Sequence, residues 1–327
     1  MFIPIQIHSS ALPVNRYAAL HRSLKTRAIH PRLHYQTAEQ SHKWLLVHRK
    51  FSPAVARVKT FQIYKKAAVR LIKNWDLSSA HIVSLGCGDG NKDILFLQSF
   101  YQHKHSIQYV PCDINTELVL QATIRAARIV PFSKCMPTVC DLEHTKDFNA
   151  YLNSKLPVSI PRIFLFFGIL PNMEVRQAQR CLRSLLRPKD ILLISANLAP
   201  DSDYLKSVRS ILPQYDNPET RDWLLTLLDG LGVSKNAGKL HFAIRPANAY
   251  SKLKKIEAIY LFKRSAAIIV EKVSYKFKEG DTLSLFFSYR YTQTLAQEFL
   301  ASLGVSMLFK CLDDQGEETV LGGVYIK

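Results

Sequence analysis

The sequence predicts an α/β fold in which a mostly parallel sheet, covered by helices on both faces, ends in an antiparallel hairpin. Three observations support this prediction. Short apolar runs alternate with amphipathic, helix-like stretches from residue 80 to residue 196, which is typical of βαβ units. The apolar runs are nearly continuous, as expected for strands that are buried on both faces. Two final apolar runs flank turn residues at 313–317 and predict the hairpin.

The alternating region predicts its elements one by one. Each expected strand is a short apolar run, and each expected helix has apolar residues three or four positions apart. The expected strands are 81–86, 107–112, a short strand within 137–142, 162–167 and 190–196, and the expected helices are 91–100, 116–130 and 174–187.

The flanking regions do not show this regular alternation of predicted strands and helices. Residues 36–73 have helical spacing with a break at Ser52 and Pro53. Residues 200–253 predict helical pieces, and β-rich runs follow at 256–262, 266–273 and 282–289, with a turn at 278–281 between the last two. A helix at 292–303 precedes the hairpin, whose strands are 305–312 and 319–326.

The charge of the chain is strongly positive and unevenly distributed. The 327 residues include 44 Lys and Arg against 26 Asp and Glu, a formal net charge of +18. Residues 1–75 hold 14 of these cations and a single acid, Glu39. Such asymmetry indicates nucleic acid or another anionic surface as a partner. The alternative is a set of solvated helix faces, because the cations are interspersed with apolar residues and form no run of five.

Several classes of protein are disfavoured. The longest strongly apolar stretch, at 163–170, is too short to cross a bilayer, and the first twenty residues lack the features of a signal peptide. The six cysteines form no C-x-x-C pair and no Cys/His cluster with zinc spacing. We therefore expect a cytoplasmic protein with reduced thiols, no membrane partner and no metal.

The most informative stretch is SLGCGDGNKD at 84–93, where Gly86, Gly88 and Gly90 follow a predicted strand and precede a predicted helix. Glycine permits positive φ and close approach of the backbone, and a helix N-terminus presents N–H groups to a ligand. The spacing G-x-G-x-G matches neither the dinucleotide fingerprint nor the Walker A loop. The alternative is a strand-to-helix turn with a purely structural role.

Two aspartates follow the next two strands. Asp113 ends IQYVPCD, where a carboxylate can accept both hydroxyls of a ribose. Asp141 ends TVCD, where its side chain and the backbone of Leu142 can contact an adenine edge. Such sheets bind ligands outside the carboxyl ends of their strands. Either aspartate alone would equally be a helix N-cap. Together with the glycine loop, they resemble the cofactor site of class I S-adenosylmethionine-dependent methyltransferases.

From about residue 34 to the C-terminus the chain resembles a narrower family, the histidine-specific methyltransferases. This family includes the enzyme of the ergothioneine pathway that trimethylates the α-amine of histidine, and fungal N-methyltransferases of indole amino acids. The matching blocks occur in the family's order and are LGCGDGNKD (85–93), YVPCDIN (109–115), LFFGILPNMEV (165–175), YDNPETRDWLLTLLDGL (215–231) and FFSYRYT (286–292).

The resemblance implies a role for each matching residue. Lys92 meets an anion, namely the carboxylate of the cofactor's methionine moiety. Asn172 and Tyr215 hold the α-carboxylate of the substrate, and Ser288 contacts its side chain. Tyr35 takes the place of an N-terminal aromatic residue near the amine. Taken singly, Asn172 would be a turn residue and Tyr215 a packing aromatic.

One departure from the family concerns the substrate. Members that methylate histidine carry a glutamate two positions before the serine, where it binds the imidazole, whereas this chain has Phe286. Losing that carboxylate removes both attraction and selectivity. We therefore expect a substrate other than histidine, with an aromatic or aliphatic side chain that contacts Phe286, Phe287, Ala258 and Tyr260.

The resemblance implies S-adenosyl-L-methionine as cofactor and in-line transfer of its methyl group to an amine. The first hypothesis is an N-methyltransferase of an amino acid or related small molecule, with no general base assigned. The second is a methyltransferase of RNA or protein that docks on the basic N-terminal segment. A third is a relative that binds the cofactor without turnover. Candidate base-stacking residues for the second are His30, His34, Tyr35, Trp44 and His48.

The resemblance also implies a class I methyltransferase fold, with a Rossmann-like sheet of seven strands and a smaller α+β substrate domain. The expected cofactor-binding domain comprises 61–198 and 286–327, and the expected substrate-binding domain comprises 1–60 and 199–285. The active site would lie in the cleft between them.

Overall fold

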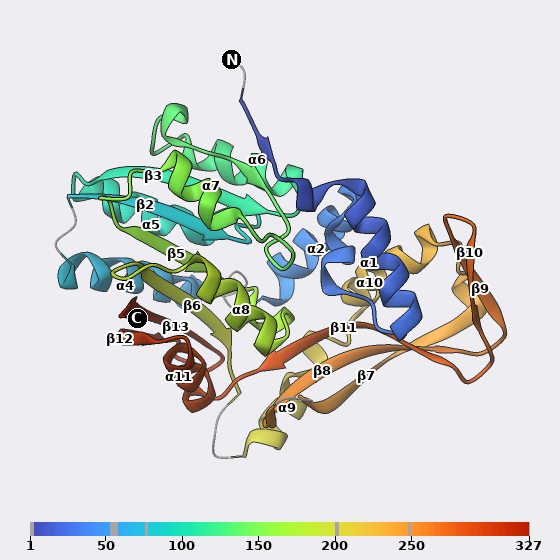
Figure 1. The fold of residues 1–327 in the computed structure, drawn as a ribbon. Coiled ribbons are helices and arrows are strands. Elements are labelled where there is room, and N and C mark those ends of the chain that lie inside the picture. Colours follow the sequence, from blue (N-terminus) through green and yellow to red (C-terminus); the bar gives the residue numbers. More distant parts are fainter. Residues whose placement is uncertain (1–2, 53–57, 76–77, 200–202, 248–249, 327) are drawn as a thin grey trace. The chain divides into compact units, whose positions relative to one another are not determined.

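A computed structural model describes residues 3–52, 58–75, 78–199, 203–247 and 250–326 (Figure 1). The chain divides into two compact units. Unit 1 comprises residues 1–11, 57–200 and 291–327, and unit 2 comprises residues 12–56 and 201–290.

The core of unit 1 is an eight-stranded sheet in the order β1-β4-β3-β2-β5-β6-β13-β12. Strands β1 to β6 pair in parallel, whereas β13 is antiparallel to both β6 and β12. The predicted mostly parallel sheet with a late hairpin is confirmed. The strands are β1 (Gln6–Ile7), β2 (Ser79–Leu85), β3 (Ser106–Asp113), β4 (Thr138–Val139), β5 (Arg162–Phe166), β6 (Ile191–Asn197), β12 (Val305–Leu312) and β13 (Glu318–Tyr325).

The helices of unit 1 cover both faces of this sheet (Figure 1). Helices α4, α5 and α6 contact one another in series on one face, and α7 packs on α8. N-cap side chains define where several helices begin. For example, the Asn115 side chain accepts the Leu118 N–H at 3.0 Å at the start of α6. The helices are α4 (Val58–Asn74), α5 (Asn91–Gln102), α6 (Thr116–Ala126), α7 (Phe148–Lys155), α8 (Val175–Leu185) and α11 (Gln293–Ser302).

Unit 2 is built from helices and two small antiparallel sheets, β11-β8-β7 and β9-β10. Its core is aromatic and aliphatic, with Trp223, Tyr260, Phe262 and Phe286 among the buried side chains. The elements are α1 (Pro13–Thr26), α2 (Ala38–Phe51), α9 (Tyr204–Ile211), α10 (Pro218–Gly230), β7 (Gly238–Ala247), β8 (Tyr250–Phe262), β9 (Ala266–Val270), β10 (Val273–Phe277) and β11 (Thr282–Arg290).

Six 3₁₀ helices complete the secondary structure of the described residues. They are η1 (Ser9–Ala11), η2 (Pro31–Tyr35), η3 (Phe132–Lys134), η4 (Leu170–Asn172), η5 (Leu212–Gln214) and η6 (Lys235–Ala237).

Some sequence-based expectations were wrong. The run 266–273 is two strands, because Glu271 and Lys272 adopt φ of 45° and 71° and turn the chain back between Val270 and Val273. Residues 238–247 form β7 and residues 250–253 begin β8, in place of the expected helical pieces. The expected helix at 116–130 ends at Ala126. A helix break was expected at Ser52 and Pro53. Ser52 is the C-cap of α2, and Pro53 lies outside the described residues.

Candidate active site

The predicted glycine loop joins β2 to α5, and its three glycines all have positive φ, of 67°, 52° and 76° at Gly86, Gly88 and Gly90. The protein itself excludes side chains at two of these positions. A Cβ at Gly86 would lie 2.0 Å from Ile169 Cδ1, and one at Gly90 would lie 2.8 Å from Ala122 Cα. The loop therefore packs closely against α6 and against the segment that follows β5, which explains Gly86 and Gly90 without a ligand.

Asp113, at the end of β3, is a buried acid that hydrogen-bonds to the backbone of this loop. Its Oδ2 accepts the Gly88 N–H at 3.1 Å, and its Oδ1 accepts the Asn115 N–H at 3.0 Å. Burial raises the pKa of the Asp113 carboxyl to about 6. A carboxylate has about four acceptor sites, and the backbone of Ile114 also donates to Asp113, so acceptor capacity for one hydroxyl group remains.

The carboxylate of Asp141, which follows β4, contacts residues close to it in the sequence. Its Oδ1 accepts the Glu143 N–H at 3.0 Å, and its Oδ2 lies 2.8 Å from His144 Nδ1. This is the geometry of an Asx turn, which an aspartate forms without a ligand. Leu142 is half-buried, and within the described residues its backbone N–H has no hydrogen-bond acceptor. The predicted adenine contact thus has a backbone donor available at Leu142.

The N-terminal segment reaches this region, which sequence reasoning missed. The Ser10 Oγ accepts the Asp141 N–H at 2.9 Å and lies 3.0 Å from Thr145 Oγ1. The neighbouring strand β1 pairs in parallel with β4. Ile5 and Ala11 also pack against a buried cluster. The members of that cluster are Cys87, Val119, Ala122 and Val139. A two-residue strand gives too short an alternation to be recognised in the sequence.

Lys92, in the first turn of α5, has a partner within the protein. Its Nζ lies 3.4 Å from Glu318 Oε1 and 4.8 Å from the centroid of the Tyr64 ring. The side chain is only 12% exposed. The same Nζ would lie 3.7 Å from a Cβ placed on Gly168, which follows β5 at a φ of 79°. Lys92 is thus held beside the β5 loop, next to a carboxylate that the sequence did not indicate.

Asn172 ends the 3₁₀ helix η4 in the same loop of unit 1. Its backbone N–H donates to the Ile169 carbonyl at 2.8 Å. The side chain is half-buried and makes no hydrogen bond within the described residues. Its amide is therefore available to a ligand.

In unit 2, the side chains of Tyr215 and Ser288 contact each other. The Tyr215 hydroxyl lies 2.9 Å from Ser288 Oγ. The guanidinium of Arg290 lies 5.1 Å from the centroid of the Tyr215 ring, and Arg290 is fully buried. Phe286, Ser288 and Arg290 alternate along β11 and so share one face. Arg290 was missed because a cation inside a strand suggests solvent exposure.

Phe286 occupies this face among aromatic rings. Its centroid lies 5.2 Å from that of Trp223 and 6.1 Å from that of His34, and its strand partner is Ala258. The expectation that Phe287 shares this pocket was wrong, because consecutive strand residues point to opposite faces. Phe287 instead lies 5.3 Å from Lys255 Nζ.

The aromatic residues of the N-terminal region serve the core of unit 2. Tyr35 lies 5.6 Å from Trp44 and 5.5 Å from Trp223, as measured between ring centroids. His34 is completely buried, and its Nε2 lies 2.7 Å from the Leu285 carbonyl oxygen. Burial lowers the pKa of His34 to about 4, so the ring is neutral and donates this bond. The expectation that His34 is available to stack on a base was wrong. For Tyr35, the structure provides aromatic packing partners.

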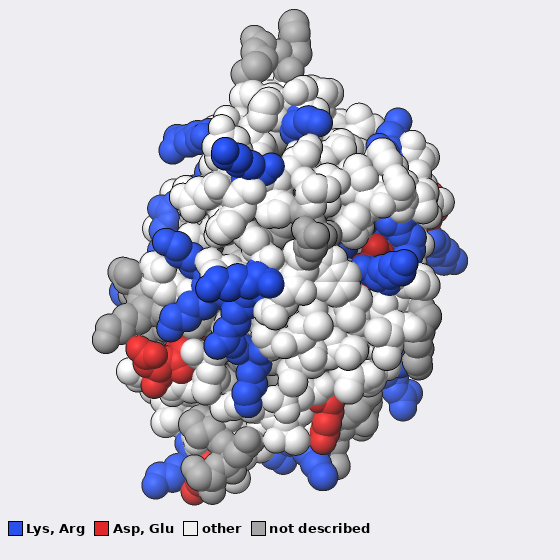
Figure 2. Space-filling model, turned by 90° about the vertical axis from the view of Figure 1, so that its left-hand side faces the viewer, with Lys and Arg blue, Asp and Glu red and all other residues white. Residues whose placement is uncertain are grey.

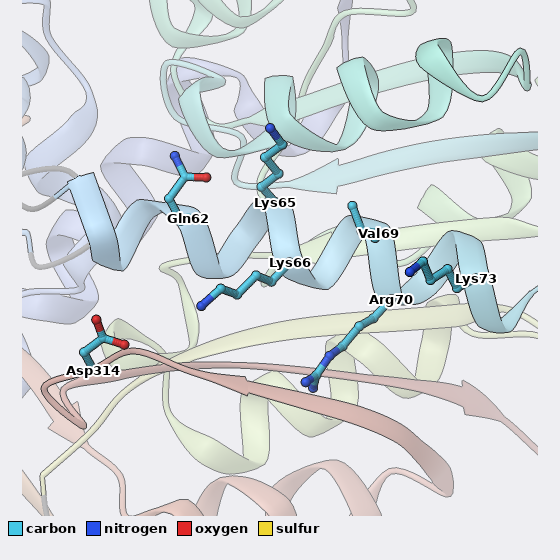
Figure 3. A pocket seen from close by; sticks show the side chains of 7 residues that line it. All are labelled: Gln62, Lys65, Lys66, Val69, Arg70, Lys73 and Asp314. Carbon is cyan, nitrogen blue, oxygen red and sulfur yellow. The ribbon is translucent and has the colours of Figure 1, made fainter.

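A basic groove runs along α4 in unit 1 (Figure 3). Its volume is about 710 Å³. Lys66 and Arg70 extend on the side of the β12–β13 hairpin, which carries the single acid of the lining (Figure 3). On the face drawn in Figure 2, Lys and Arg side chains are far more frequent than Asp and Glu side chains. The lining residues are Gln62, Lys65, Lys66, Val69, Arg70, Lys73 and Asp314.

Two further features concern the described residues alone. These residues contain no group of three or more His, Cys, Asp or Glu side chains able to hold a metal ion. Across the same ranges, no helix is long and apolar enough to cross a membrane.

A doubly wound sheet with a glycine loop after one central strand and a buried aspartate after the next is the site architecture of class I methyltransferases. The sequence matches the model of the family described as "Histidine-specific methyltransferase, SAM-dependent" over residues 18–321. The chain therefore belongs to this family and is an S-adenosylmethionine-dependent methyltransferase.

Comparison with solved structures matches the chain to methyltransferases at low sequence identity. The magnesium protoporphyrin IX methyltransferase of Synechocystis PCC 6803, with bound SAH, is 12% identical, with a TM-score of 0.48 over 89% of this chain and 96% of that one. An amino pentose methyltransferase from Micromonospora echinaspora, with bound SAM, is 10% identical, with a TM-score of 0.40 over 86% of this chain and 96% of that one. Among curated proteins, none matches the chain.

The chain's residues fit this cofactor. Asp113 has acceptor capacity for a ribose hydroxyl. Leu142 has a backbone donor for an adenine nitrogen, and Lys92 is a cation close to the glycine loop. These are the donors and acceptors that an adenosyl group with an amino-acid tail requires.

Proposed function

We propose that the protein transfers a methyl group to the amine of an amino acid or related small molecule whose side chain is apolar, and that histidine is not its substrate. Phe286 carries this proposal. It stands where the family's histidine-methylating members have a glutamate, and its ring packs against Trp223 and beside Ala258. An apolar wall gives an imidazole N–H no acceptor, so a hydrophobic side chain is favoured.

Three groups in unit 2 support recognition of an amino-acid carboxylate. The hydroxyls of Tyr215 and Ser288 are 2.9 Å apart, and the Arg290 guanidinium lies beside the Tyr215 ring. A hydroxyl pair next to a buried cation is complementary to a carboxylate. These groups would hold the α-carboxylate and leave the α-amine free to react.

The chemical task of these residues is alignment. When bound, the cofactor supplies a methyl group that its sulfonium already makes electrophilic. Asp113 and Lys92 hold the two ends of the cofactor, while Tyr215 and Ser288 orient the substrate. Placing two reactants in line in this way is worth about 7–11 kcal/mol of the barrier. No side chain is assigned as a general base.

The experiment that tests this proposal is a panel of the common amino acids and biogenic amines, incubated with the protein and methyl-labelled cofactor. We expect label on the amine of an aromatic or aliphatic amino acid and none on histidine. The Asp113→Asn variant is the matched control for background transfer. Efficient labelling of histidine would contradict the assignment of Phe286.

The groove on α4 favours a second candidate, a methyltransferase that acts on RNA. Lys65, Lys66, Arg70 and Lys73 line one helix with a single acid opposite them, and such a surface binds phosphates in a salt-dependent manner. Total RNA added to the same panel distinguishes the two functions. Label in RNA and in no small amine would favour the second, and replacing Lys66 and Arg70 with glutamine would then abolish it.

A further inference from the structure

Glu318, the first residue of β13, is a buried carboxylate that the family resemblance does not explain. Its Oε1 accepts a hydrogen bond from the Tyr64 hydroxyl and lies 3.4 Å from Lys92 Nζ. Its Oε2 is equally buried and has no hydrogen-bond partner in the part of the chain that the structure describes. The residue is only 1% exposed.

An open acceptor of this kind requires a reason. Buried polar atoms nearly always have partners, and a buried carboxylate without them is strongly unfavourable. Lys92 and Tyr64 both act on Oε1. Burial and the charge of Glu318 raise the pKa of Tyr64 well above its usual value, so its hydroxyl stays protonated as a donor. Oε2 therefore lacks a donor among the described residues.

The position of Glu318 identifies that donor. Glu318 pairs with Asn197, the last residue of β6, and so lies at the edge where the parallel strands end. Ser195, two residues earlier in β6, accepts the Gly168 N–H at 3.0 Å. Gly168 lies beside Lys92, which belongs to the first turn after the glycine loop. The open oxygen is thus at the cofactor edge of the sheet.

We propose that Lys92 and Glu318 together bind the zwitterionic amino-acid end of S-adenosylmethionine, with Lys92 on its carboxylate and Glu318 Oε2 on its α-ammonium. The opposite charges of the protein pair match the opposite charges of the ligand. An ammonium has three donors, so Lys92 retains Glu318 while it binds a carboxylate. The proposal rests on the cofactor alone and is independent of which amine the protein methylates.

Three adenosyl ligands separate the two contacts in titration calorimetry. S-adenosylhomocysteine has both charged groups, its decarboxylated analogue has only the ammonium, and 5′-methylthioadenosine has neither. We expect Glu318→Gln to weaken the binding of the first two ligands by about 30-fold, which is about 2 kcal/mol. The affinity for 5′-methylthioadenosine should not change. Lys92→Met should weaken S-adenosylhomocysteine alone.

Every other pattern overturns the proposal. Equal loss for all three ligands in Glu318→Gln would mean a structural role, and loss for S-adenosylhomocysteine alone would mean that Glu318 acts through Lys92. No loss for any ligand, with a raised KM for the amine, would assign Glu318 to the substrate's ammonium. Asp314→Asn removes an exposed carboxylate from the same hairpin and is the matched control. If Glu318→Gln does not fold, the Lys92→Met titrations with the three ligands test the pairing.

Discussion

At the scale of single residues, the proposed substrate selectivity depends on Phe286 and its neighbours on β11. Phe286, Ser288 and Arg290 present an apolar ring, a hydroxyl and a cation in sequence along one face. Under the proposed function, each group would contact a different part of an amino acid. The ring would contact the side chain, whereas the hydroxyl and the cation would contact the carboxylate.

A Phe286→Glu variant should gain affinity for histidine. The new carboxylate would stand two residues before Ser288 and supply the acceptor that an imidazole N–H requires, a contact worth about 1–3 kcal/mol. Histidine binding to the variant, measured by calorimetry in the presence of S-adenosylhomocysteine, checks this expectation. Phe287→Glu, on the opposite face of β11, is the matched control. Identical histidine affinities in the two variants would show that the face has been misassigned.

At the scale of elements, the N-terminal segment stabilises the chain after β4, because Ser10 accepts a hydrogen bond from the Asp141 N–H. Ser10→Ala would leave the buried Asp141 N–H without an acceptor, and we expect this to lower the free energy of unfolding by about 1–3 kcal/mol. Urea unfolding of the variant measures the loss. Gln6→Ala, an exposed change in β1, should have little effect. A Ser10→Ala variant as stable as the parent protein would contradict this role of the segment.

The elements that could be predicted from the sequence are those with a strong hydrophobic periodicity. Strands β2, β3, β5 and β6 and helices α5 and α8 have apolar patterns several residues long, and each lies close to its expected range. The hairpin at 266–277 was missed because its turn is Glu271-Lys272, which has neither Gly nor Asn to mark positive φ.

The parts of the candidate site that could not be predicted depend on distant pairing. Glu318 and Lys92 are 226 residues apart, and only the register of β13 on β6 brings them together. Arg290 could not be recognised because its burial depends on the whole of unit 2. The glycine loop and Asp113 could be predicted, because adjacent strand ends in a parallel sheet meet at one edge.

At the scale of the whole molecule, the stability of unit 1 should depend on pH through Asp93. This carboxyl is buried in the first turn of α5, where its Oδ2 accepts the Tyr109 hydroxyl at 2.6 Å, and burial raises its pKa to about 7. A folded-state pKa above the usual 3.8 means that folding favours the protonated form. The free energy of unfolding should therefore fall as pH rises from about 4 to about 7.

Asp93→Asn should remove this component of the pH dependence. A tenfold change in an ionisation constant corresponds to about 1.4 kcal/mol, so the two proteins should differ in slope by an easily measured amount between pH 4 and pH 7. Urea unfolding at several pH values, with Asp314→Asn as the exposed control, provides the comparison. Parallel curves for the parent protein and Asp93→Asn would mean that Asp93 is ionised throughout.

The whole account depends on Asp113 as the acceptor for the cofactor's ribose, and calorimetric titration of S-adenosylhomocysteine at several pH values tests this most directly. Because burial raises the pKa of Asp113 to about 6, affinity should increase as pH rises through 6 and the carboxylate forms. In Asp113→Asn, affinity should fall at least tenfold and lose this dependence. Absence of binding to the parent protein, or equal binding to both proteins at every pH, would contradict the account.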